Sequence, residues 1–206
     1  MLSVNDLSCH RGERRLFSGV GFQLKAGTCL YLEGDNGVGK TSLLRQISGL
    51  LPVSVGQISW CGKPIADNEF FRTQLIYLGH NLAMKDDLSA MENLQIDAAI
   101  AGQAVDPDKV LSALKSLGLK GREHLPIRVL SQGQKRRAAL ARLLTRQASL
   151  WILDEPVVAL DVPAQAAVGR VLKAHLEKGG MVLFTSHQPL PMAIPSASIT
   201  SYRLQG

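Results

Sequence analysis

The sequence contains few cysteines, and their spacing excludes two classes of small protein. Only three of its 206 residues are cysteine, at Cys9, Cys29 and Cys61. An odd number without a C-x-x-C pair suits neither a disulfide framework nor a structural zinc site. Reduced thiols are typical of cytosolic proteins. We expect a hydrophobic core to hold the fold, because a chain of this length buries enough surface to do so.

Long apolar runs and biased segments are also missing. No stretch approaches the roughly 18 consecutive apolar residues of a spanning helix, and the start of the sequence lacks the layout of a signal peptide. The absence of low-complexity tracts and heptads excludes collagen-like, coiled-coil and disordered chains. We predict one globular domain over residues 1–206 with no direct membrane span.

Positive charge exceeds negative charge, which suits a protein that meets anions. The 23 Lys and Arg against 17 Asp and Glu give a net charge of +6, although ordinary solubility explains this balance equally well. One basic run consists of Lys135, Arg136, Arg137, Arg142 and Arg146. No aromatic residues interleave with it, so we interpret it as the solvated face of a helix and predict no nucleic-acid binding.

The hydrophobic pattern favours an α/β fold. Alternating apolar residues near 2–4 and 20–24 predict antiparallel strands at the start of the chain. Beyond them strands alternate with helices, which is typical of a parallel sheet flanked by helices. The expected segments are strands at 28–33, 150–153 and 181–185, and helices at 39–47, 89 onward, 106–118, 132–146 and up to 178. We predict a mixed sheet core with an antiparallel edge and a helical lobe inserted at about 82–130.

A glycine-rich segment between a predicted strand and helix fits the pattern G-x-x-x-x-G-K-[ST] of a phosphate-binding loop. It reads Gly34, Asp35, Asn36, Gly37, Val38, Gly39, Lys40 and Thr41, followed by Ser42. Glycines let backbone N–H groups approach phosphate oxygens, and the helix N-terminus adds partial positive charge. Lys40 is expected to reach the β/γ-phosphates and Thr41 to ligate Mg²⁺. A dinucleotide-binding fingerprint is disfavoured because the third glycine is missing.

A second nucleotide-binding element ends in two acidic residues. The apolar strand at 150–153 is followed by Asp154 and Glu155. Ligands of open α/β sheets bind at the carboxyl ends of the strands. We expect Asp154 to hold Mg²⁺ and Glu155 to polarise an attacking water. Together the two elements predict a P-loop NTPase that uses ATP and Mg²⁺.

Further motifs resemble those of the ABC-transporter ATPases. Leu130 to Arg137 is similar to their signature, with Gln132 replacing a glycine, and 159–161 is similar to their D-loop. Ser131 is a good helix N-cap, which leaves N–H groups free to meet an anion. The resemblance implies that two chains enclose two ATP molecules as a homodimer. The residues it implicates are Ser131, Gly133, Gln134, Asp161 and the switch histidine His187.

Two positions depart from that family. His80 stands where the family carries a magnesium-contacting glutamine, and imidazole is a poor substitute because Mg²⁺ prefers oxygen ligands. The aromatic residue that stacks on adenine is missing near His10 and Arg11. Arg11 could stack on the base, although we interpret it as a solvated surface residue.

Several short sequence segments resemble those of one branch of this family, the haem-exporter ATPases of bacterial cytochrome c maturation. They lie at 77–80, 91–94, 126–131 and 139–144, in a chain of similarly short length. The resemblance implies docking on integral membrane subunits of a haem-exporter complex, peripherally on the cytoplasmic face of the inner membrane. The alternatives are an ATPase for another small-molecule transporter, an ABC-type ATPase that acts on DNA or ribosomes, and a small-molecule kinase.

Overall fold

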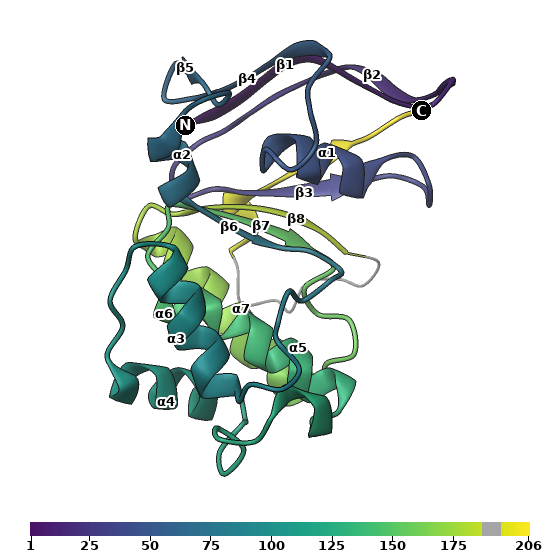
Figure 1. Ribbon diagram of the computed structural model, residues 1–206. Helices are drawn as coiled ribbons and strands as arrows, with labels where there is room; N and C mark the ends of the chain where they lie inside the picture. The colour runs from purple at the N-terminus through teal and green to yellow at the C-terminus, as the bar shows by residue number, and fades with distance from the viewer. Residues whose placement is uncertain (187–194) are drawn as a thin grey trace.

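The computed structural model describes residues 1–186 and 195–206, and its strands form two sheets (Figure 1). The first sheet is antiparallel with the order β2-β1-β4-β5. Its strands are β1 (Leu2–Arg11), β2 (Arg14–Leu24), β4 (Val55–Trp60) and β5 (Lys63–Pro64). The antiparallel start of the chain is therefore confirmed.

The second sheet is parallel and has the order β6-β7-β8-β3-β9. Its strands are β3 (Cys29–Glu33), β6 (Leu75–Leu78), β7 (Leu150–Asp154), β8 (Met181–Thr185) and β9 (Ile199–Arg203). The predicted α/β class with both strand types is confirmed, and the structure divides these types between two sheets. Because the second sheet is parallel, the carboxyl ends of β3, β6, β7 and β8 share one edge.

Two hydrophobic cores lie on opposite faces of the parallel sheet. Within β7, Leu150 and Ile152 belong to one core, whereas Trp151 and Leu153 belong to the other. A strand buried on both faces reads as a continuous apolar run, as this one does. Helix α1 (Lys40–Ile47) lies between the two sheets, and the longer helices cover the far face of the parallel sheet (Figure 1).

Two further helices begin where the sequence predicts them to, at 89 and 106. Ser89 and Glu92 form a capping box at the start of α3 (Ala90–Ile100), and Asp106 caps α4 (Pro107–Ser116) with a proline in its first turn. The helices are α2 (Glu69–Thr73), α3 (Ala90–Ile100), α4 (Pro107–Ser116), α5 (Gln132–Leu140), α6 (Arg142–Thr145) and α7 (Val162–Glu177), with 3-10 turns η1 (Ile127–Val129) and η2 (Ser196–Ser198).

Two expectations for the segment 132–146 were wrong. The single helix is interrupted at Ala141, which separates α5 from α6. Its basic side chains do not form a solvated face either, because Arg136 and Arg142 are buried. Arg142 bonds to the carbonyl of Ala83 and lies 3.6 Å from the carboxylate of Asp97. The arginines bury their charge by finding acceptors inside the fold, which sequence periodicity does not reveal.

Candidate active site

The glycine-rich loop between β3 and α1 needs glycine for conformational and steric reasons. Gly34 has a φ of 146° and Gly39 a φ of 109°, a region in which side chains are strained. A Cβ at Gly34 would lie 2.8 Å from the carbonyl oxygen of Leu204, and one at Gly39 would lie 2.9 Å from the ring of Phe17. The first turn of α1 therefore opens onto the loop, with its N–H groups toward an anion site.

The side chain of Lys40 folds back and bonds to carbonyl groups of the phosphate-binding loop. Its Nζ donates to the carbonyl oxygens of Gly34 at 2.6 Å and Asp35 at 3.0 Å. The ammonium charge is thus held beside the amides of the loop. A phosphate group that enters the loop meets both a full positive charge and the helix N-terminus.

A chain of hydrogen bonds joins α1 to the ends of β7 and β8. The hydroxyl of Thr41 donates to Oδ2 of Asp154 at 2.8 Å, and the hydroxyl of Thr185 donates to Oδ1 at 2.6 Å. The same Thr185 oxygen accepts from the amide of Glu155 at 3.0 Å. Asp154 is 5% exposed, so these bonds satisfy a carboxylate that is almost entirely removed from water.

Glu155 follows in a left-handed backbone conformation with a φ of 52°. This conformation is uncommon for residues other than glycine, and surrounding bonds must hold it. Thr185 binds its amide from one side, and the guanidinium of Arg136 donates to its carbonyl from the other. The second carboxylate is therefore presented on a fixed turn at the carboxyl edge of the sheet.

These residues surround a cleft of about 250 Å³. It is lined by Arg11, Leu16, Asn36, Gly37, Gly39, Lys40, Thr41, Ser42, Asp154 and Glu155. Hydroxyl and carboxylate oxygens are the ligands that Mg²⁺ prefers, so Thr41 and Asp154 fit this ion. Within residues 1–186 and 195–206 no group of three His, Cys, Asp or Glu side chains could hold a metal.

The signature residues lie outside this cleft. Ser131 caps α5 in a capping box with Gln134, as its residue type predicts. Gly133 lies so close to the chain at 159 that a Cβ would be 2.7 Å from the Ala159 carbonyl oxygen. Asp161 caps α7 and pairs with Arg137 at 2.9 Å. None of the four residues Ser131, Gly133, Gln134 and Asp161 lines the cleft.

The sequence also predicts two histidines, His80 and His187, as residues of the site. His80 is exposed just beyond β6 and does not line the cleft. His187 lies outside the described residues. The strand that leads toward it is fixed by Tyr31, whose ring stacks on Phe184 and whose hydroxyl donates to the Ser186 carbonyl at 2.7 Å.

Sequence reasoning assigned no role to Thr185 or Arg136. Thr185 is 1% exposed and links both acidic residues. Its place at the carboxyl end of a strand beside β7 was a usable signal, because polar side chains there face ligands. For Arg136 the sequence offered only a basic run, and nothing in that pattern distinguishes a buried arginine from a solvated one.

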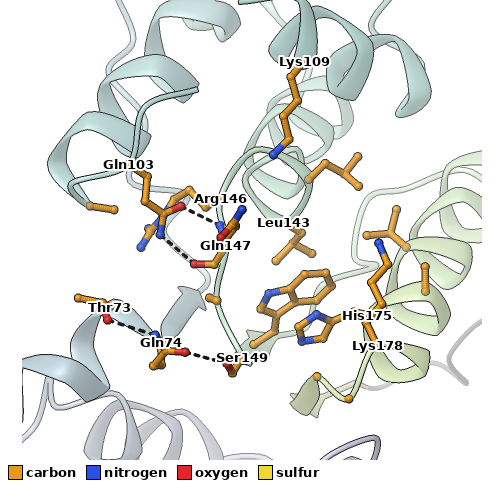
Figure 2. Close-up of a pocket in the computed structure, with 18 of the residues that line it drawn as sticks. Thr73, Gln74, Gln103, Lys109, Leu143, Arg146, Gln147, Ser149, His175 and Lys178 are labelled. Carbon is orange, nitrogen blue, oxygen red and sulfur yellow. Dashed lines mark hydrogen bonds between the residues drawn. The ribbon is translucent and has the colours of Figure 1, made fainter. Parts of the chain in front are cut away.

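A larger cavity, of about 1120 Å³, lies at the opposite edge of the parallel sheet (Figure 2). It is bordered by the starts of β6, β7 and β8 and by the ends of α6 and α7. The rings of Trp151 and His175 stack at 3.6 Å within it. No residue of the phosphate-binding loop lines it.

The fold and the loop-and-carboxylate site together define a P-loop NTPase domain. Residues 17–158 match the ABC transporter family, which places this domain in the ABC transporter class. A putative ABC transporter ATP-binding protein from Pyrococcus furiosus has a similar structure, with a TM-score of 0.82, 27% identity and coverage of 98% of this chain and 96% of that one.

Two curated relatives narrow the assignment. The cytochrome c biogenesis ATP-binding export protein CcmA of Dechloromonas aromatica is 48% identical over 99% of this chain and 100% of that protein. CcmA of Pseudomonas aeruginosa is 47% identical over 93% of this chain and 95% of that protein. The chain belongs to the CcmA family of ABC transporter ATP-binding proteins.

Proposed function

We propose that this chain hydrolyses ATP to drive an export step in cytochrome c biogenesis, with haem as the substrate of the membrane complex. The observation that carries the hydrolytic part is the bonded series Thr41, Asp154, Thr185 and Glu155 beside the phosphate-binding loop. The two CcmA relatives are named as export proteins of cytochrome c biogenesis, which supports the export part.

In the proposed reaction a water oxygen attacks the γ-phosphorus of ATP, and the bond to the β–γ bridging oxygen breaks to release ADP. Lys40 and the loop amides stabilise the charge that develops on the phosphate oxygens. Thr41 and Asp154 would hold Mg²⁺, which neutralises phosphate charge when bound. Glu155 orients the water and accepts its proton, and His187 contacts the γ-phosphate.

We further propose that two copies enclose the nucleotide. Within one chain the cleft contains none of the signature residues, so a second chain is needed to bring a helix start such as that of α5 to the γ-phosphate. His80 would lie at the rim of the closed site. Export work then comes from the difference in affinity of the closed dimer for ATP and ADP.

We propose that the chain docks on membrane subunits, peripherally on the cytoplasmic face of the inner membrane. Residues 1–206 then form one ATPase domain, with a helical lobe at 82–130. In the part of the chain that the structure describes, no helix is long and apolar enough to cross a bilayer. We propose that separate integral membrane proteins supply the span, which the export role named for the CcmA relatives supports.

The test is the variant Glu155→Gln. We expect it to bind Mg·ATP normally but to hydrolyse it at least about 100-fold more slowly, because a general base contributes 10²–10⁴-fold. Glu177→Gln, an exposed change at the end of α7, is the matched control and should hydrolyse at the wild-type rate. Retention of hydrolysis by Glu155→Gln would refute the assigned role.

In cells whose only copy carries Glu155→Gln, c-type cytochromes should lack covalently attached haem while b-type cytochromes remain normal. Haem staining of denatured proteins, compared with the b-type absorbance of intact membranes, measures this. Normal covalent haem would refute the haem assignment and favour the alternative of another small-molecule transporter, without affecting the assignment as an ABC ATPase.

A further inference from the structure

Arg136, from the first turns of α5, places a charged group among backbone carbonyl oxygens. Its guanidinium donates to the carbonyls of Asp154 at 2.8 Å, Gly79 at 3.2 Å and Pro156 at 3.4 Å, and also to that of Glu155. The residue is 7% exposed. One side chain thus ties the signature helix to the turn that follows β7 and to the end of β6.

Burial of this charge is costly, so its bonds must compensate. Burial lowers the pKa of Arg136, while the nearby charges of Asp154 and Glu155 raise it. A planar guanidinium can serve several acceptors in fixed directions, which a flexible ammonium does not do. The acceptors here all belong to the backbone. The guanidinium of Arg136 therefore fixes the backbone of other chain segments and not the position of another side chain.

One of the segments that Arg136 fixes carries the proposed base. The backbone of Glu155 has a left-handed φ. Its amide donates to Thr185, and its carbonyl accepts from Arg136, so both ends of the residue are held. Removal of the carbonyl anchor would let this turn relax, and the carboxylate would move with it. Small displacements of a reacting group lower rates strongly while substrate binding is kept.

We propose that Arg136 is a positioning residue for hydrolysis, which holds the backbone of Glu155 in its working conformation and links that backbone to the signature helix α5. The inference rests on the proposed function, because it concerns the same reaction. Through the buried side chain of Arg136, a movement of α5 would therefore reach the carboxylate of Glu155.

Arg142 provides a matched comparison within the same segment. It is also buried and donates to a carbonyl, that of Ala83, at 2.7 Å. Burial lowers its pKa as well, and its ion-pair partner is Asp97 of α3. None of the contacts that Arg142 makes with described residues reaches the turn after β7. A purely structural loss should therefore be similar in the two arginines, whereas a loss of positioning should appear only at Arg136.

The experiment compares Arg136→Lys with Arg142→Lys, in Mg·ATP, with rates divided by the measured stoichiometry of bound ATP. Each change keeps the charge and removes the planar fork. For Arg136→Lys we expect kcat to fall about tenfold with KM within about twofold of wild type. For Arg142→Lys we expect kcat within about twofold of wild type, although the Tm of both variants falls. If Arg136→Lys does not fold, Arg136→Gln keeps two N–H donors and takes its place.

A double variant tests whether Arg136 acts through Glu155. When Glu155→Gln is already present, Arg136→Lys should lower the residual rate by less than about twofold, because the group it positions is gone. Equal losses of kcat at Arg136 and Arg142, or a full tenfold loss in the double variant, would overturn the inference. A wild type that hydrolyses no ATP would instead overturn the proposed function and the inference with it.

Discussion

The two edges of the parallel sheet differ in a way that cavity size does not predict. The carboxyl edge has a cleft of about 250 Å³, and the amino edge has a cavity of about 1120 Å³. The smaller one contains the phosphate-binding loop and both acidic residues. The larger one is lined by Lys109, Arg146, Arg170 and Lys178, with no acidic residue among its described lining.

The difference follows from the direction of the chain. At the carboxyl edge β3 leads into the N-terminus of α1, which presents N–H groups and partial positive charge. At the amino edge α7 ends before β8 begins, so carbonyl groups point there instead. Only the first arrangement offers phosphate a set of converging donors.

Some polar groups at the amino edge bond to one another, although Trp151 Nε1 and His175 Nε2 have no hydrogen-bond partner among the described residues. Gln103 donates to the carbonyl of Gln147 at 2.9 Å and accepts from its amide at 2.8 Å. Ser149 donates to Gln74 at 2.7 Å, and Figure 2 shows these bonds around the cavity. The cavity is a seam between the helices and the sheet, whereas the cleft has groups arranged for a ligand.

The largest effect that separates the two edges is expected for lysine replacements. Lys40→Met should weaken ATP binding about 100-fold, equivalent to about 2.7 kcal/mol, because it removes the charge from the phosphate-binding loop. Lys178→Met makes the same change at the larger cavity and should leave the affinity for ATP unaltered. Calorimetric titration with Mg·ATP measures both. Weakening of equal size would mean that net charge, not the loop, governs binding.

A smaller effect is expected from buried threonines. Thr185→Val removes the donor to Asp154 and should cost about 2 kcal/mol of unfolding free energy and about tenfold in hydrolysis. Thr145→Val is the control, because among the described residues its hydroxyl bonds only to the nearby carbonyls of Ala141 at 3.3 Å and Arg142 at 3.5 Å. This control should cost less than about 1 kcal/mol and leave hydrolysis unchanged. Urea unfolding and phosphate release provide the two readouts, and full hydrolysis by Thr185→Val would contradict the bonded series.

The last effect concerns stability alone, at the amino edge, and depends on pH. Burial lowers the pKa of His175 to about 4, below its value in the unfolded chain, so folding favours the neutral ring. The resulting stability is complete above about pH 6.5 and is lost as the pH falls toward 4. Between pH 7 and pH 5 this group should remove about 2 kcal/mol from the free energy of unfolding.

His175→Phe keeps an aromatic ring beside Trp151 and cannot titrate. Its unfolding free energy should therefore fall less than that of wild type over the same interval, as measured by urea unfolding at both pH values. His10→Asn, at an exposed position, should follow the wild type. An identical pH dependence in His175→Phe and wild type would show that the ring does not titrate as burial requires.

Local signals in the sequence determined the recognisable parts of this protein. A phosphate-binding loop such as Gly34 to Thr41 requires glycines and a lysine at fixed positions. The helix caps Ser89, Asp106 and Ser131 are identified by residue type and spacing. Such features depend on neighbours within a few residues, so one sequence suffices to predict them.

Only the tertiary structure decided how these parts meet. The order β6-β7-β8-β3-β9 places Thr185 beside Asp154, although 31 positions separate them in the sequence. It also surrounds Arg136 with carbonyls from 79 and from 154–156, which turned an expected surface charge into a buried anchor. Whether a polar side chain is solvated or bonded depends on contacts between distant segments, and local periodicity carries no information about those contacts.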